Sequence, residues 1–312
     1  MLRLFCLFTL FFVASAQAEV RVLTSIKPLQ LIAAAVQDGI GEPEVLLPPG
    51  ASPHHYALRP SDVRRVRDAD LLYWIGPDME AFLPRVLSSR DKPQLAVQDL
   101  PGMTLRHFGE SHEEHDHDDH DHEYAHAGDD LGHDHDHRPG SLDAHLWLAS
   151  DNAKVIAARM AADLAKLDAA NAGRYAANLK AFEARLDALD GRIRPQLAAL
   201  QGKPYFVFHE AFDYFEAAYG LKHAGVFSVL SEVQPGARHV AAMRERLQQT
   251  GPSCVFSEPP LRPRLAETLT AGLPVKLAEL DALGGTLPVN ASGYEQLLEN
   301  LANGLSECLN SL

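Results

Sequence analysis

Hydrophobic positions in the first hundred residues alternate between the period of a strand and that of a helix. Short apolar runs rich in β-branched residues predict strands, and stretches with apolar residues at helical spacing follow them. The predicted strands are residues 20–26, 43–50 and 71–76. The predicted helices are residues 29–39, 60–69 (with Ser61 as N-cap) and 77–89. Strands that alternate with helices indicate βαβ units and a parallel sheet.

The second half of the chain repeats this alternation after an Ala-rich helical region. That region predicts two long helices over residues 155–167 and 175–193, with a break near 168–173. The second should run about 25 to 30 residues in all, long enough at about 1.5 Å per residue to reach from one domain to another. The strands predicted after it are residues 205–208, 224–230, 254–257 and 274–280. The helices predicted with them are residues 209–220, 237–249, 264–272 and 293–309.

These patterns divide the chain into two α/β lobes joined by a long helix. A length of 312 residues favours two domains of ordinary size. We assign residues 19–167 to the N-terminal lobe, 168–200 to the linking helix and 201–312 to the C-terminal lobe. The N-terminal lobe is interrupted by a polar insertion at residues 107–140.

Residues 1–18 have the pattern of a secretory signal peptide. A basic residue at Arg3 precedes an apolar run from Leu4 to Val13, and Ala16-Gln17-Ala18 is an A-x-A cleavage site. The apolar run is short for a membrane span, so we expect removal of the signal and export of the mature chain. A retained N-terminal anchor is the alternative.

The polar insertion is dominated by histidine and acidic residues. Residues 112–137 hold eleven Asp and Glu and no Lys or Arg, so the rest of the chain carries a net charge near −3 of the total −14. With no basic stripe, nucleic-acid binding has little support. We expect a disordered loop whose metal sites are weaker than a preformed cleft, because ordering the loop costs entropy. Its accessory ligands are His112, His115, His117, His120, His122, His126, His133, His135 and His137.

Two cysteines, Cys254 and Cys308, remain after removal of the signal. An exported chain reaches a compartment that permits oxidation, so a disulfide between them is the first interpretation. Two buried thiols are the alternative. Neither cysteine has the close partner of a C-x-x-C motif.

Candidate metal ligands stand where predicted strands end. Ligands of parallel sheets bind beyond the carboxyl ends of the strands. His54, His209 and Asp281 follow predicted strands, and His145 precedes the central helices. Three imidazoles and one carboxylate make a complete tetrahedral set for a first-row divalent cation, with zinc preferred.

Other histidines and acids near these positions are harder to assign. We place three other histidines outside the site. His55 is next to His54, His223 lies in a predicted turn, and His239 lies in an Arg-rich predicted helix. Zinc-bound imidazoles normally donate their second N–H to an oxygen acceptor. The carboxylates available for that role are Asp143, Glu210, Glu232 and Glu258, and the sequence does not choose among them.

Five motifs carry a family resemblance that covers essentially the mature chain. They are "PGASPHHYALRPSD", "DAHLWL", "VFHEAFDYF", "FSEPPL" and "LDALG". In this order they resemble the metal-binding solute receptors of ABC transporters, the cluster A-I class. That resemblance implies two (β/α)4 lobes bridged by a rigid long helix, with a metal held between the lobes by His54, His145, His209 and Asp281. It also agrees with a C-terminal disulfide.

The resemblance further implies a zinc receptor rather than a manganese receptor. Zinc members have His at the position of His209, where manganese members have the harder ligand Glu. Pro53 stands where some zinc members have a carboxylate, so the fourth ligand is Asp281 or water. Ala144 and Ala282 replace usual prolines, which affects loop stiffness more than chemistry.

The expected function is capture of Zn²⁺ in the periplasm by a monomer and delivery to a membrane permease driven by a cytoplasmic ATPase. The expected contact with the membrane is through that complex alone. The alternatives are a manganese receptor or metal-linked adhesin of the same class and, from another class, a zinc hydrolase. A hydrolase requires a general base, and the one H-E-x-x-H match, residues 122–126, lies in the polar insertion and not at any of the candidate ligands His54, His145 or His209.

Overall fold

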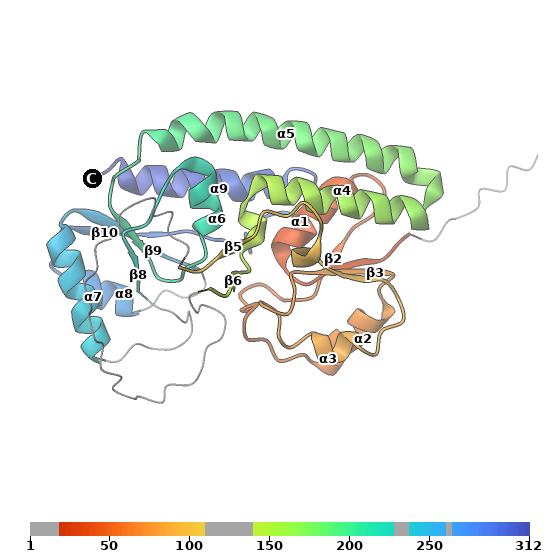
Figure 1. The fold of residues 1–312 in the computed structure, drawn as a ribbon, viewed down its shortest axis with the longest axis horizontal. Helices are drawn as coiled ribbons and strands as arrows, with labels where there is room; N and C mark the ends of the chain where they lie inside the picture. The colour runs from red at the N-terminus through yellow and green to blue at the C-terminus, as the bar shows by residue number, and fades with distance from the viewer. Residues whose placement is uncertain (1–18, 110–139, 228–236, 260–263) are drawn as a thin grey trace, which may run out of the picture.

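The computed structural model describes residues 19–109, 140–227, 237–259 and 264–312. In these ranges the chain forms two four-stranded parallel sheets, one in each lobe, and a long helix that runs beside both lobes (Figure 1). This confirms the predicted α/β class. The signal-like segment 1–18 and the nine histidines of 112–137 lie outside the described residues.

The N-terminal sheet has the strand order β2-β1-β3-β4. Its strands are β1 (Val22–Thr24), β2 (Glu44–Val45), β3 (Leu71–Trp74) and β4 (Gln94–Ala96). Three helices follow strands of this sheet: α1 (Lys27–Val36), α2 (Pro60–Asp68) and α3 (Pro84–Leu87). Every residue of the central strands β1 and β3 is buried, as parallel strands covered on both faces require. The carboxyl ends of all four strands therefore meet at one edge of the lobe.

The C-terminal sheet has the order β10-β9-β7-β8 and is again parallel. Its strands are β7 (Tyr205–Val207), β8 (Gly225–Val226), β9 (Ser253–Ser257) and β10 (Val275–Glu279). Its helices are α6 (Asp213–Tyr219), α7 (Ala237–Thr250), α8 (Arg264–Thr270) and α9 (Gly293–Leu309). The central strand β9 is buried along its whole length.

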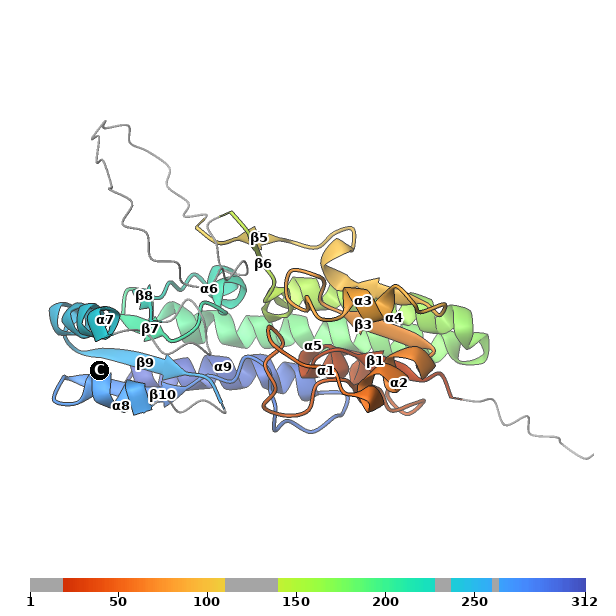
Figure 2. The same cartoon turned by 90° about the horizontal axis from the view of Figure 1, so that it is seen from below.

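Two helices, α4 (Ser150–Leu167) and α5 (Ala172–Ala198), form the connection predicted from the Ala-rich region. The 27 residues of α5 give a helix of about 40 Å. Asn178 donates to the carbonyl of Val36, the last residue of α1, at 3.0 Å, and Gln196 donates to Ser306 of α9 at 3.0 Å. These bonds tie α5 to both lobes. Figures 1 and 2 show α5 running along both of them. Among the described helices, none is both long and apolar enough to cross a membrane.

Two local predictions in the N-terminal lobe are wrong. Helix α2 begins at Pro60 with Arg59 as N-cap, not Ser61, and the Asp62 carboxylate accepts the Arg59 N–H at 2.9 Å. The helix predicted over 77–89 is reduced to the four residues of α3. The Glu80 carboxylate accepts the Ile75 N–H at 2.7 Å, which holds a turn in place of the first helical turns. Proline at position 84 then marks a new helix start, because it has no N–H to donate.

Three strands escaped the sequence patterns. These are β4 and the antiparallel pair β5 (Arg106–His107) and β6 (Leu142–Asp143). None of them contains a β-branched residue, so the signal that marked the other strands is missing. The β5–β6 pair flanks the histidine-rich tract, so the interval 107–140 begins inside β5.

A disulfide joins Cys254 in β9 to Cys308 in α9, with the two Cα atoms 6.2 Å apart. The two sulfurs are therefore bonded, and the alternative of two separate thiols does not apply. The bond attaches the last helix to the central strand of the C-terminal sheet.

Candidate metal centre

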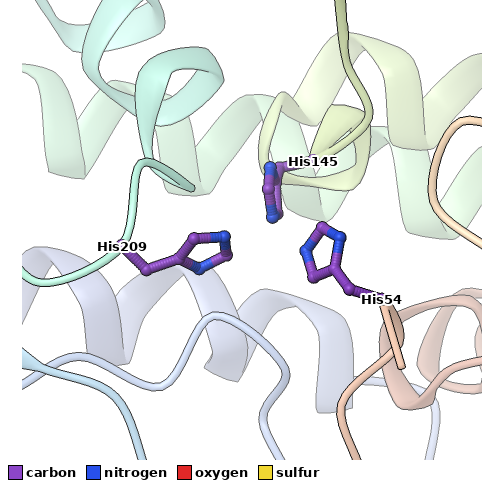
Figure 3. A group of neighbouring side chains, drawn as sticks. All are labelled: His54, His145 and His209. Atoms are coloured by element: carbon purple, nitrogen blue, oxygen red, sulfur yellow. The ribbon is translucent and has the colours of Figure 1, made fainter. Parts of the chain in front are cut away.

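His54, His145 and His209 meet between the two lobes although they are far apart in sequence. Each offers a ring nitrogen, and the three nitrogens lie within 4.8 Å of one another. The ring centroids are 5.4 Å apart for His54 and His145, 5.3 Å for His54 and His209, and 4.8 Å for His145 and His209. Figure 3 shows the three side chains pointing toward a common point from three different segments.

Each histidine is brought to this point by a different element. His54 lies in the loop after β2, and His209 comes two residues after the end of β7. His145 immediately precedes the short 3-10 helix Leu146–Leu148 that leads into α4. The first two positions follow the rule that loops at the carboxyl ends of parallel strands form the site. His145 and His209 are buried, with 2% and 6% of their surface exposed, whereas His54 is half-buried.

Asp143 holds the imidazole of His145. Its Oδ1 lies 2.7 Å from His145 Nδ1 and accepts the backbone N–H of the same residue at 3.0 Å. With Nδ1 engaged, Nε2 is the nitrogen presented to a metal. Burial raises the pKa of the Asp143 carboxyl well above its usual range, and Asp213 and Glu210 raise it further. A divalent cation on the imidazole would favour the ionised carboxylate.

Glu258 has the same role for His209. Its Oε1 lies 3.1 Å from His209 Nδ1, which leaves Nε2 for a metal. The structure thus selects Asp143 and Glu258 from the four carboxylates that the sequence offered. Glu210 belongs to a separate group with Asp213 and His223, and Glu232 lies outside the described residues.

Asp281 organises a loop beside the centre. Its Oδ1 accepts the N–H groups of Leu283 and Gly284 at 3.0 and 2.8 Å, and its Oδ2 accepts that of Gly285 at 2.8 Å. Three backbone bonds occupy the carboxylate, and among the described residues the close metal-binding group contains the three histidines without it. Oδ2 accepts only one of these bonds and keeps a lone pair for a metal, but to ligate the ion the carboxylate would have to approach the three imidazoles more closely.

Two aromatic residues that sequence reasoning missed brace the site. The Tyr214 hydroxyl of α6 donates to the Asp143 carbonyl at 2.8 Å and accepts the Arg106 N–H at 2.9 Å. Trp147 donates its indole N–H to the Ala282 carbonyl at 2.8 Å. Both bonds link the segment around His145 to the C-terminal lobe. Their partners lie more than sixty residues away, so no local pattern could have found them.

The donor set determines what the centre can bind. Two imidazole nitrogens on one tetrahedral zinc ion lie about 3.4 Å apart, since Zn–N bonds are about 2.0–2.1 Å. Ring nitrogens within 4.8 Å therefore reach that geometry with small side-chain movements. Three neutral imidazoles suit Zn²⁺ better than the harder Mn²⁺.

The chain resembles a known protein family over nearly its whole length. A family model described as the periplasmic zinc-uptake complex component A, ZnuA, matches residues 22–308. The high-affinity zinc uptake system protein ZnuA of Yersinia pestis is 41% identical over 294 residues, which cover 94% of this chain and 92% of that protein.

The fold is also similar to solved structures. The solute-binding protein FpvC of Pseudomonas aeruginosa, in complex with Mn²⁺, superposes with a TM-score of 0.73 at 20% identity, covering 94% of this chain and 99% of that one. A zinc-bound ZnuA deletion mutant superposes with a TM-score of 0.72 at 21% identity, covering 93% and 98% of the two chains. At these identities the likeness establishes the fold.

Proposed function

This chain belongs to the ZnuA family of periplasmic zinc-uptake components, and on that premise we propose that it captures one Zn²⁺ between its lobes on His54, His145 and His209. It is a receptor, not an enzyme, and serves an ABC uptake system with a membrane permease and an ATPase. The observation that carries the ligand assignment is the convergence of three ring nitrogens within 4.8 Å from both lobes.

The fourth ligand completes a tetrahedral zinc site. Water fits this position without disturbing the loop at Asp281, whose carboxylate already accepts three backbone N–H groups. Asp281 has a lone pair left on Oδ2, but it lies outside the close group of ligand atoms and would have to move toward the ion. We therefore place water first and Asp281 second.

The selectivity for zinc over manganese follows from the ligand types. Manganese binds well to carboxylate, carbonyl and water oxygens, whereas imidazole suits zinc. The acids Asp143 and Glu258 are engaged with Nδ1 of His145 and His209, and so support the imidazoles. A manganese receptor or adhesin is the nearer alternative. Metal analysis after stripping and competitive reloading with equal Zn²⁺ and Mn²⁺ distinguishes them, because a manganese receptor would retain Mn²⁺.

A zinc hydrolase has less support, because a hydrolase requires a base near the metal-bound water. Glu258 and Asp143, the carboxylates in contact with the ligands, are bonded to imidazole nitrogens. A zinc-loaded preparation that hydrolysed activated esters faster than its metal-free form would favour the hydrolase.

The remaining proposals concern the export signal, the histidine tract and the oligomeric state. Residues 1–18 act as a removed signal peptide. The nine histidines from His112 to His137 bind further ions more weakly than the cleft, because their chain must be ordered around each ion. The mature protein acts as a monomer.

Calorimetry tests the central assignment with zinc and the mature chain. A triple variant with alanine in place of His54, His145 and His209 should no longer bind one zinc ion per chain tightly. Alanine at the exposed neighbour His55 is the matched control and should retain tight binding, as should deletion of residues 112–137. The assignment fails if the deletion removes tight binding while the triple variant keeps it.

A further inference from the structure

His54 reaches the metal centre from a loop, whose own attachments therefore matter for the site. Residues 46–59, between β2 and α2, contain neither helix nor strand, and we call this segment the His54 loop. At its start, the Leu46 N–H donates to the Thr24 carbonyl at the end of β1, at 2.7 Å. This bond holds the beginning of the loop and not the part that carries His54.

Burial alternates along the second half of the His54 loop. His54, Tyr56 and Leu58 are half-buried, whereas His55 and Ala57 are exposed. This period of two is that of an extended backbone, which places alternate side chains on opposite sides. Tyr56 and Leu58 pack against the hydrophobic core, so they fix which side of the segment faces inward. His54 is on that inward side, which explains why it is presented to the metal centre and its neighbour His55 is not.

Tyr56 makes two contacts that hold this part of the loop. Its hydroxyl donates to Oδ2 of Asp62 at 3.0 Å, and its ring meets the ring of Phe82 edge-on, with the centroids 5.8 Å apart. Asp62 is buried, and the same Oδ2 accepts the Arg59 N–H at 2.9 Å at the start of α2. One carboxylate oxygen therefore fixes both the N-terminus of a helix and the side chain two residues after His54.

Phe82 is fixed in turn to the edge of the N-terminal sheet. It lies in the segment between β3 and α3. In that segment the Glu80 carboxylate accepts the Ile75 N–H at 2.7 Å, and the Glu80 carbonyl accepts the Leu83 N–H at 2.9 Å. Tyr56 thus connects the His54 loop, through Phe82, to the carboxyl end of β3.

We propose that Tyr56 is a positioning residue that holds His54 at the metal centre and thereby slows the release of zinc. The inference rests on the proposed function, since it requires His54 as a ligand. Without the two contacts of Tyr56, the His54 loop has more conformations in the metal-free protein, and zinc must order them. The apparent affinity falls with the fraction of molecules whose loop is ready to ligate, so a ready fraction of about one in ten raises Kd about tenfold.

Chelator competition and stopped-flow release of zinc from the mature chain test this role. Tyr56→Ala removes both contacts and should raise the zinc Kd about tenfold, mainly through faster release. Tyr56→Phe keeps the ring contact with Phe82 and loses only the bond to Asp62, so its Kd should lie between those of the parent and Tyr56→Ala. Tyr175→Phe is the matched control. It removes a hydroxyl bond of the same length, 3.0 Å, to Asp168 near the start of α5, and should bind and release zinc as the parent does.

A double-mutant cycle separates the positioning of His54 from a general effect on the fold. Zinc affinity is measured for the parent, for Tyr56→Ala, for His54→Ala and for the double variant. A residue that acts through His54 should have no further effect once that imidazole is absent. If Tyr56→Ala weakens zinc binding equally in both backgrounds, Tyr56 acts on the fold and the inference is overturned. An unchanged Kd and release rate in the parent background overturn it as well.

The triple alanine variant of the three histidines separates this inference from the proposed function. If that variant keeps tight binding, the proposed function fails, and the role of Tyr56 fails with it. If it loses tight binding while both Tyr56 variants behave as the parent does, only the role of Tyr56 is refuted. Should Tyr56→Ala not fold, Tyr56→Phe decides alone, and a Kd and release rate equal to those of the parent overturn the inference.

Discussion

Replacing Asp143 with Asn should weaken zinc binding without weakening the metal-free fold. Asp143 is fully buried and makes one side-chain contact with His145 Nδ1, at 2.7 Å. Asn preserves the shape, and its amide oxygen can still accept both N–H groups of His145. The substitution removes the negative charge that strengthens the imidazole as a ligand.

The magnitude follows from the role of this contact. Loss of a carboxylate behind a metal-bound histidine typically costs about 10–100-fold in metal affinity, or about 1.4–2.7 kcal/mol. The Asn variant should lose zinc affinity by a factor near the lower end of this range. Alanine should fall near the upper value and also destabilise the fold, because it leaves the His145 backbone N–H without its acceptor.

The metal-free protein should respond differently to Asn. Burial raises the pKa of the Asp143 carboxyl, so the ionised form is disfavoured in the folded state without zinc. A neutral amide should therefore leave the free energy of unfolding unchanged or raise it. Zinc increases the free energy of unfolding by an amount that grows with the ratio of free zinc to Kd. In the Asn variant this increase should be smaller by the binding free energy that was lost.

Chelator competition gives the zinc Kd, and urea unfolding with and without zinc gives the two free energies. An Asn variant with unchanged Kd would refute the role of Asp143. If the metal-free Asn variant loses as much free energy of unfolding as it loses free energy of zinc binding, Asp143 stabilises the fold and not the zinc site.

Four further predictions use other parts of the molecule. Burial raises the pKa of Glu80 from 4.5 to about 7, so its contribution to stability is present below pH 4.5 and is lost as pH rises through 7. Urea unfolding should show Glu80→Gln gaining about 2.5 kcal/mol over the parent between pH 5 and 8, and equal pH profiles would contradict this. Reducing the Cys254–Cys308 bond, which spans 54 residues, should cost about 4 kcal/mol of unfolding free energy; a loss below about 1 kcal/mol would argue against it. Zinc affinity measured by calorimetry should decrease as pH drops below about 6.5, the ordinary pKa of imidazole, because a protonated histidine cannot ligate zinc. An affinity that stays constant to clearly acidic pH would count against histidine ligation. Scattering curves with and without zinc should have nearly the same radius of gyration, since α5 is bonded to both lobes through Asn178 and Gln196, and a large change would indicate a hinge.

Local sequence patterns predicted much of the fold because the forces they report are local. The last helix, residues 293–309, matches α9 in full, since its apolar positions repeat at helical spacing. The helix predicted over 77–89 failed because a buried carboxylate, Glu80, captures backbone N–H groups and favours a turn. That contact depends on burial, which a single window of sequence does not report.

The sequence by itself determined which side chains could bind a metal and that they would stand at strand ends. Only the tertiary structure decided which of them meet. His54, His145 and His209 are separated by more than sixty residues at each step, and their convergence depends on the order of strands in two sheets and on α5 holding both lobes. The choice of Asp143 and Glu258 and the grouping of Glu210 with His223 were decided in the same way. Periodicity acts along the chain, whereas ligand geometry depends on packing between lobes.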